Sequence, residues 1–333
     1  MDWPLPIRIL LGPFSRVYGI GSTWRAWLYA QGALRARKLT APVVSVGNLT
    51  VGGTGKTPMV LWLAERFTAE GKRVAILSRG YRGSGETSDE IELMRTKLRD
   101  GVMFGVGPDR FAEGRKIESK RLVDVFLLDD GFQHLALARD LDILLVDSTR
   151  PLQRERLLPA GRLREPASAI ARADLVVVTR AHQAAFAAPE VAKVASLPIF
   201  QALTRLDGFK RFRADGEAAS VAELPQPVFA FCGIGNPDAF LADLAQWGVA
   251  VSGRKVFRDH HRYSERDARE LGLLAKGEGA KALITTEKDA QNLRDLTLPL
   301  PVYCCEIRME ISDEAQFWGI VRRVLPESAK AAS

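Results

Sequence analysis

Short apolar runs alternate with amphipathic stretches along most of the chain, and this alternation predicts strands that alternate with helices. In the first part of the chain, the apolar runs cover residues 43–46, 74–78, 102–106, 123–128, 141–146 and 175–178. Runs this short and this continuously apolar are typical of strands buried in a parallel sheet, with helices as the connections. The first part of the chain is therefore expected to be an α/β domain with a mostly parallel sheet.

A second series of the same kind follows a stretch without clear periodicity. Residues 189–227 are rich in alanine and proline, so we place a domain junction there. Beyond it, strands are expected at 228–233 and near 249–256, 282–286 and 301–306, with helices at 237–247 and near 264–276, 287–295 and 313–325. With 333 residues the chain is also long for one core. We predict an N-terminal segment (1–38), a first domain (39–205) and a smaller, Rossmann-like C-terminal domain (206–333).

The first apolar run leads into a glycine-rich loop with the features of a phosphate-binding P-loop. The loop ends in Gly55-Lys56-Thr57, and apolar residues follow at helical spacing. In such a loop, backbone N–H groups and the helix N-terminus bind phosphate oxygens, the lysine contacts the β- and γ-phosphates, and the threonine hydroxyl binds Mg²⁺. We assign the nucleotide to Thr50, Val51, Gly52, Gly53, Thr54, Gly55, Lys56 and Thr57. Because Thr50 stands where the full pattern has glycine, a turn without a ligand is the alternative.

Two further strand ends carry polar residues that suit the same site. Residues 123–128 are followed by Asp129 and Asp130, and a strand beside the P-loop would aim such a carboxylate at Mg²⁺. An aspartate pair that only caps a turn is the alternative. The run 74–78 leads into a basic glycine-rich loop that begins with Arg79, and ligands of open α/β sheets collect at such ends. The first domain is therefore predicted to be of the P-loop NTPase type.

The N-terminal segment combines apolar and aromatic residues with arginines. Asp2 is its only acidic residue, and the next along the chain is Glu65. Aromatic residues and arginines at a helical period are typical of a segment that lies in a membrane interface. A helix that packs on the P-loop domain, with its arginines solvated, is the alternative, and one segment could do both.

Composition narrows the choice of partners and location. The net charge of +7 and the pI near 9.4 favour an anionic partner, which leaves nucleotide, nucleic acid and an anionic membrane surface. Nucleic acid is the weakest of these, because basic residues concentrate beside aromatics at the N-terminus. Three cysteines and four histidines show neither a disulfide framework nor zinc-ligand spacing, which fits a reducing cytosol. No secretory signal and no apolar run long enough for a spanning helix are found.

A magnesium–nucleotide site serves either phosphoryl transfer or a hydrolytic switch. A GTPase would carry Asn-Lys-x-Asp or Thr-Lys-x-Asp after a late strand, and partitioning-type ATPases carry a lysine where this chain has Val51. A membrane-associated switch or chaperone ATPase is therefore kept as the alternative to a kinase. A kinase needs a group that accepts the proton of the attacked hydroxyl. Asp89 and the pair Asp259-His260 are the candidates, although an exposed Asp-His-His turn is ordinary.

Taken together, the motifs resemble one family, the tetraacyldisaccharide 4′-kinases of the lipid A pathway. The matching stretches are 44–50 with 55–58, Ser78-Arg79-Gly80-Tyr81, Asp89-Glu90, 106–110, 129–134, 158–161 with 163–165, 233–237, Asp259-His260-His261 and 286–290. They follow the order of the family and are spread over most of the chain. The loop with Thr50 is also normal in that family.

The resemblance implies a reaction, a place and a set of residues. It implies ATP- and Mg²⁺-dependent phosphorylation of the 4′-hydroxyl of a tetraacylated glucosamine disaccharide 1-phosphate, by two α/β/α domains with the active site in the cleft between them. It implies a peripheral enzyme, predicted here to be a monomer, at the cytoplasmic face of the inner membrane. The roles carried over are Asp89 as base with His260 and Asp259, metal ligands at Thr57, Asp129, Asp130, Glu90 and Glu165, and substrate contacts at Arg79, Arg164 and His134.

Two positions depart from the family pattern. Around the base the family usually has Gly-Asp-Glu-Pro, where this chain has Ser88-Asp89-Glu90-Ile91. The proline would fix the turn after the carboxylates, so its loss puts their placement in question. Arg162 stands where the family has a second proline, and this extra cation is expected either to contact a substrate phosphate or to be solvated.

Overall fold

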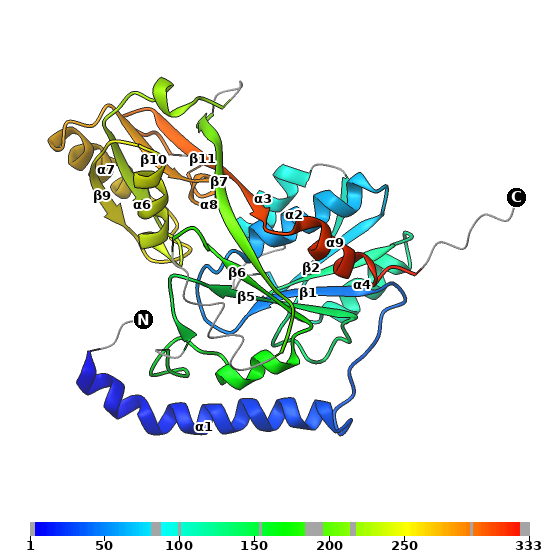
Figure 1. Ribbon diagram of the computed structural model, residues 1–333. Helices are drawn as coiled ribbons and strands as arrows, with labels where there is room; N and C mark the ends of the chain where they lie inside the picture. The colour runs from blue at the N-terminus through cyan, green and yellow to red at the C-terminus, as the bar shows by residue number, and fades with distance from the viewer. Residues whose placement is uncertain are drawn as a thin grey trace, which may run out of the picture. The chain divides into compact units, whose positions relative to one another are not determined.

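The chain forms two compact units, which Figure 1 shows in ribbon form. The computed structural model describes residues 4–80, 88–98, 101–152, 155–183, 196–213, 218–293 and 296–326. The first unit comprises Met1–Thr87, Met94–Leu203 and Glu310–Ser333, and the second comprises Ser88–Leu93 and Thr204–Met309. The chain therefore passes from one unit to the other several times. Tyr81, which belongs to the predicted basic loop after Arg79, lies outside the described residues.

The first unit is built on a parallel sheet. Its strands are β1 (Val43–Asn48), β2 (Val74–Ser78), β3 (Val102–Val106), β4 (Val125–Asp129), β5 (Leu141–Asp147), β6 (Leu175–Thr179) and the start of β7 (Ile199–Arg211). Their order is β3-β2-β4-β1-β5-β6-β7, and each pair is parallel. Strands β1, β2, β4, β5 and β6 are buried along their whole length, which explains their continuously apolar sequences. The predicted parallel α/β sheet is confirmed.

Strand β7 lies within the stretch 189–227, where the domain junction is predicted and no strand was expected. Its first residues pair with β6, with Ile199 opposite Val176 and Ala202 opposite Thr179. Phe200 and Ala202 are buried while Gln201 is exposed, so the alternation of a half-buried strand is present. That alternation covers too few residues to stand out in an alanine- and proline-rich stretch, and the tertiary pairing decides the structure.

Helices accompany this sheet. They are α1 (Leu5–Ala30), α2 (Lys56–Ala69), α4 (Arg110–Glu118), the 3₁₀ segment Ala167–Arg172 and α9 (Glu314–Arg322). Helix α3 (Asp89–Leu98) is divided between the units, with its residues from Met94 onward in the first. The buried side of α2 is formed by the apolar residues that its sequence pattern predicts. Helix α9 brings the end of the chain back onto α2, where the Trp318 ring lies 4.8 Å from that of Phe67 and the Phe317 ring 5.5 Å from that of Trp62.

The second unit is a smaller parallel sheet with a helix on each face. Strands β8 (Val228–Cys232), β9 (Val251–Val256), β10 (Ala282–Thr286) and β11 (Val302–Ile311) run in the order β11-β10-β8-β9. Helices α6 (Pro237–Gln246), α7 (Glu265–Gly277) and α8 (Glu287–Gln291) follow β8, β9 and β10. Alternate residues of β8 point to opposite faces: Ala230 packs with Leu244 of α6, and Phe231 packs with Leu271 of α7.

Helix α1 is held by its inner face and exposes its outer face. The Ser15 hydroxyl donates to the carbonyl of Leu157 and accepts from the N–H of Ala160, both at 3.0 Å. Large apolar side chains on the other face are 60–71% exposed at Ile9, Leu10, Phe14, Val17, Ile20 and Trp24. The helix therefore both packs on the first unit and presents an apolar surface. None of the helices in the described part of the chain has the length and apolar character needed to cross a membrane.

Candidate active site

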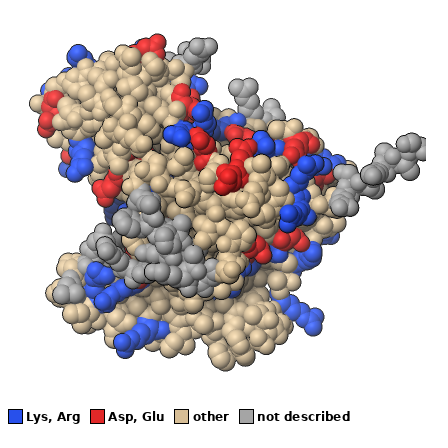
Figure 2. Space-filling model, viewed as in Figure 1, with Lys and Arg blue, Asp and Glu red and all other residues tan. Residues whose placement is uncertain are grey.

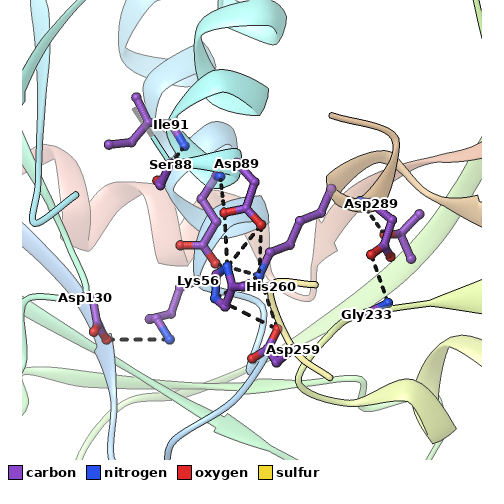
Figure 3. Close-up of polar contacts among 12 residues, drawn as sticks. Lys56, Ser88, Asp89, Ile91, Asp130, Gly233, Asp259, His260 and Asp289 are labelled. Carbon is purple, nitrogen blue, oxygen red and sulfur yellow. Dashed lines mark hydrogen bonds and ion pairs between the residues drawn. The ribbon is translucent and has the colours of Figure 1, made fainter. Parts of the chain in front are cut away.

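The glycine-rich loop joins β1 to α2 in the geometry of a nucleotide site. Gly55, which precedes α2, has a φ of 88°, a left-handed conformation that suits glycine. The ammonium group of Lys56 lies 3.4 Å from Oδ1 of Asn48 and 3.5 Å from Oδ1 of Asp130, as Figure 3 shows for Asp130. Lys56 thus lies at the first turn of α2, beside an acidic strand end. An anionic phosphate at the N-terminus of α2 would meet both the helix dipole and this ammonium group.

The two aspartates at the end of β4 have different surroundings. Asp129 lies opposite Val46 in the parallel pair of β1 and β4, and its carboxylate accepts a hydrogen bond from the Ser78 hydroxyl at 3.1 Å. Asp130 leaves the strand with a φ of 51° and contacts Lys56 and Arg164. Burial alone would raise the pKa of Asp130, but the charges of Lys56 and Arg164 hold it below its usual range. Asp130 is therefore ionised at neutral pH.

The segment that contains Arg162 and Arg164 is attached to the glycine-rich loop through backbone and side-chain contacts. The N–H of Val51 donates to the carbonyl of Arg162 at 2.8 Å, and the N–H of Arg164 donates to that of Leu49 at 2.7 Å. The Arg162 guanidinium returns two hydrogen bonds to the Val51 carbonyl, at 3.0 and 3.2 Å. The Arg162 side chain, which departs from the family pattern, therefore stabilises the glycine-rich loop. The two expected roles, contact with a substrate phosphate and solvation, did not include this contact.

The carboxylate of Glu165 forms an ion pair with the guanidinium of Arg172. Both of its carboxylate oxygens accept hydrogen bonds from Arg172, at 2.5 and 3.0 Å, and its side chain is 6% exposed. Glu90 belongs to the second unit and accepts from Lys288 at 3.2 Å. Of the predicted metal ligands, Thr57, Asp129 and Asp130 are the ones that the first unit places at the P-loop and the adjoining strand end.

Oxygen donors of this kind fit Mg²⁺. The cation prefers hard oxygen ligands, and in nucleotide sites one or two carboxylates suffice because phosphates and water complete its shell. Across the described residues, no group of three or more His, Cys, Asp or Glu side chains is arranged to hold a metal ion.

A buried arginine and a half-buried histidine lie next to these aspartates, and the arginine had no predicted role. Arg110 is 7% exposed and donates to the carbonyl of Pro108, and its guanidinium lies 3.5 Å from Nδ1 of His134. Burial and the charges of Arg110 and Arg139 lower the pKa of His134 to about 4. His134 is therefore neutral at pH 7, and its Nε2 atom is buried without a hydrogen-bond partner among the described residues. Arg79, predicted to contact substrate, is exposed and its charge acts on Arg110.

The second unit assembles the predicted acid–base residues. Nδ1 of His260 lies 3.0 and 3.1 Å from the two carboxylate oxygens of Asp89 (Figure 3). Burial would raise the pKa of Asp89, but the His260 hydrogen bond and the charge of Lys288 lower it below its ordinary value. His261 does not contact Asp89 in this way, because its Nε2 lies 3.2 Å from Asp267. Of the two adjacent histidines, the one assigned from the motif is the partner of Asp89.

The departure around Asp89 has a local physical explanation. Where the family has proline, Ile91 has a backbone N–H, and this group donates to the Ser88 hydroxyl at 3.3 Å (Figure 3). Ser88 therefore acts as a cap for the first turn of α3 and satisfies a donor that proline would not have had. Ile91 is fully buried, which anchors this turn.

Three residues of these sites were not assigned from the sequence. Arg172 neutralises Glu165, Arg110 lies beside His134, and Lys288 contacts the Asp89–His260 pair. Lys288 could have been considered from the sequence, because it belongs to the run Thr286-Glu287-Lys288-Asp289, which matches the family. Nothing in that run indicates that the lysine side chain meets Glu90, which lies 198 positions earlier.

The fold and the P-loop place the protein among ATP-binding α/β enzymes of the P-loop class. Residues 7–326 match the family described as LpxK: Tetraacyldisaccharide-1-P 4′-kinase. The chain belongs to this family of kinases, which confirms the family and the enzyme class expected from the motifs.

Relatives and a solved structure agree along nearly the whole chain. Proteins named tetraacyldisaccharide 4′-kinase are 40% identical in Geobacter metallireducens, over 96% of this chain and 98% of that protein, and 42% identical in Geobacter sulfurreducens, over 93% and 92%. A crystal structure of LpxK from Aquifex aeolicus, described as an apo form in complex with ATP, is 32% identical with a TM-score of 0.77. It covers 96% of this chain and 100% of its own.

The low pKa of His134 predicts how acid affects stability. In the unfolded chain a histidine has a pKa near 6.5. In the folded protein the value is about 4, so the unfolded state binds the proton more readily. This contribution to stability is present above pH 6.5 and is lost as the pH falls towards 4. We expect His134→Gln to lose less stability than the wild type between pH 7 and pH 4.5, measured by thermal unfolding. Parallel pH dependences of the two proteins would contradict this assignment.

Proposed function

We propose that this chain transfers the γ-phosphate of ATP to the 4′-hydroxyl of a tetraacylated glucosamine disaccharide 1-phosphate, the lipid A precursor. The observation that carries the proposal is the contact between Asp89 and His260, 171 residues apart, in a member of this kinase family. A carboxylate paired with an imidazole can accept the proton of an alcohol. The P-loop with Lys56 supports ATP as the donor, in line with the ATP complex of the Aquifex aeolicus protein.

One group of residues binds the phosphates of ATP, and another accepts the proton of the acceptor hydroxyl. Lys56 and the N-terminus of α2 bind the β- and γ-phosphates, while Arg164 holds Asp130 beside them. The acceptor oxygen forms a bond to the γ-phosphorus as the bond to the bridging oxygen of ADP breaks. Asp89, ionised and oriented by the Nδ1 proton of His260, accepts the proton of the hydroxyl. A weak base suffices, because in a loose phosphoryl-transfer transition state the attacking oxygen keeps its proton until late.

Magnesium would be held by Thr57, Asp129 and Asp130, whose oxygens fit its chemistry. When bound, it supplies positive charge to the phosphate oxygens. The contacts of Asp130 with Lys56 and Arg164 already orient one carboxylate for this role. Glu165 and Glu90 act through their cationic partners Arg172 and Lys288.

The outer face of α1 supports a peripheral place at the cytoplasmic face of the inner membrane. Its outer face is apolar, and the charged residues of the helix are Arg8, Arg16 and Arg25. Figure 2 shows blue but no red side chains along the lower edge, where Figure 1 places α1. Apolar residues beside arginines suit the interface of an anionic lipid surface. There a monomer would meet a substrate whose acyl chains stay in the bilayer.

The direct test is transfer of labelled phosphate. With γ-labelled ATP, Mg²⁺ and the tetraacyl disaccharide 1-phosphate in detergent micelles, the label should appear in the lipid. Lys56→Ala should lower the rate at least about 100-fold, because phosphate stabilisation is lost, while the exposed Lys120→Ala should not. Label found only as inorganic phosphate would contradict the kinase and favour a switch ATPase.

Asp89→Asn tests the base. The amide has the shape of the carboxylate but accepts no proton at neutral pH, so turnover should fall about 100-fold or more. ATP affinity should stay unchanged, since the P-loop is intact. Turnover is measured by single-turnover kinetics, and ATP affinity is measured by calorimetry. The exposed Asp207→Asn serves as the control, and unchanged turnover in Asp89→Asn would remove the base assignment.

The outer face of α1 predicts binding to vesicles. Replacement of Leu10, Phe14, Val17 and Ile20 by serine should weaken partitioning to anionic liposomes at least tenfold, because burial of each side chain contributes about 1.5–3 kcal/mol. These residues are 62–71% exposed, so the fold should persist. A matched control replaces Leu122 and Leu273, which are 72% and 74% exposed outside α1. Equal sedimentation of all three proteins with liposomes would refute the interface.

A further inference from the structure

Lys288 lies at the centre of the acid–base residues of the second unit. Its ammonium group is 3.2 Å from Nε2 of His260, 3.2 Å from Oε1 of Glu90 and 3.4 Å from Oδ1 of Asp259. A carboxylate oxygen of Asp89 is 3.9 Å away. The lysine side chain is 17% exposed, which is unusual for a lysine and requires partners of opposite charge.

The chemistry of these groups determines where the imidazole proton lies. An ammonium group donates three hydrogen bonds and accepts none. Its neighbour Nε2 of His260 must therefore be the acceptor, with its lone pair directed to Lys288. In a neutral imidazole the proton then lies on Nδ1, which is the atom that faces both oxygens of Asp89.

The charge of Lys288 opposes a second proton on the ring of His260. Burial would lower the pKa of Lys288, but the carboxylates of Glu90, Asp259 and Asp89 raise it, so the lysine stays charged at neutral pH. The hydrogen bond that His260 donates to Asp89 raises the pKa of His260 above its ordinary value, while burial and the charge of Lys288 lower it. A second proton on Nε2 would direct an N–H at the ammonium group.

The backbone holds the ring in this place. His260 has a φ of 57°, and its N–H donates to the carbonyl of Gly233 at 3.0 Å. The N–H of Gly233 in turn donates to Asp289 at 2.9 Å. Asp289 also accepts from the hydroxyls of Tyr263 and Thr286, at 2.9 and 2.6 Å. Consecutive residues of α8 thus fix the backbone and the ring of the same histidine.

We propose that Lys288 is a positioning residue that fixes His260 as its Nδ1–H tautomer and leaves Asp89 as the group that takes the acceptor proton. The proposal rests on the proposed kinase function for the identity of that acceptor. It assigns His260 to orient Asp89 and excludes its Nε2 as the base, because that lone pair is bound to Lys288. A lysine that only neutralised three carboxylates would leave the tautomer of His260 unaffected.

The test is nitrogen NMR of the full-length protein with ¹⁵N-labelled histidine. The chain has four histidines, and the signals of His260 are identified by their loss in His260→Gln. In the wild type we expect a protonated Nδ1 and an unprotonated Nε2. In Lys288→Met the repulsive charge is gone, so the titration of His260 should move upward by about one pH unit or more. Lys288→Arg should titrate like the wild type, as should the control Lys276→Met in α7.

Activity gives a second readout. An imidazolium weakens Asp89 as a base, so kcat of Lys288→Met should fall at neutral pH, and the acid limb of its pH profile should move with the NMR titration. ATP affinity should not change.

The outcomes separate the two proposals. A protonated Nε2 in the wild type, or an unchanged His260 titration in Lys288→Met, would overturn the role of Lys288 even if the lipid is phosphorylated. The expected spectra without lipid phosphorylation would overturn the kinase proposal and leave the effect of Lys288 on His260 standing. If Lys288→Met does not fold, Lys288→Gln replaces it, since this variant keeps a polar side chain but removes the charge and should move the His260 titration in the same direction.

Discussion

The nucleotide site depends on the contacts that the Asp130 carboxylate makes with two cationic side chains. It lies between Lys56 of the P-loop and Arg164 of the segment that pairs with that loop. One carboxylate between two cations gives the cluster a net positive charge, which favours a phosphate and keeps Lys56 oriented before one arrives. The pairing of β1 with β4 sets the distance, because register places the end of one strand beside the start of the loop that follows the other.

The net charge of the clustered polar side chains has opposite sign in the two units. At the P-loop, cations exceed carboxylates among the contacting groups, as suits a site for polyanionic phosphate. In the second unit, Asp89, Glu90 and Asp259 surround a single ammonium group, so the array is net negative. Excess negative charge disfavours phosphate binding there. The charge balance of each unit thus agrees with the proposed division between phosphate binding and proton transfer.

Local patterns were sufficient for the parallel sheet, the P-loop and the acidic end of β4, because strand burial and glycine-rich turns leave their mark within a few residues. Strand β7 was not predicted, because its alternation is short and its pairing with β6 is a tertiary contact. The same limit applies to the sites. Glu165 was predicted to bind the metal, and nothing in its motif reveals its ion pair with Arg172 seven residues later, where a 3₁₀ turn brings the arginine back. Lys288 was missed because its partners come from α3 and from the loop before His260, far away in sequence.

The hydrogen bond between Ser88 and the N–H of Ile91 makes the two departures from the family pattern depend on each other. A proline has no N–H at this position, whereas the N–H of Ile91 needs an acceptor, and the Ser88 hydroxyl provides it. The turn that carries Asp89 is therefore held by a side-chain hydrogen bond in place of a rigid ring, so the identity of residue 88 is coupled to the placement of the carboxylate that follows it.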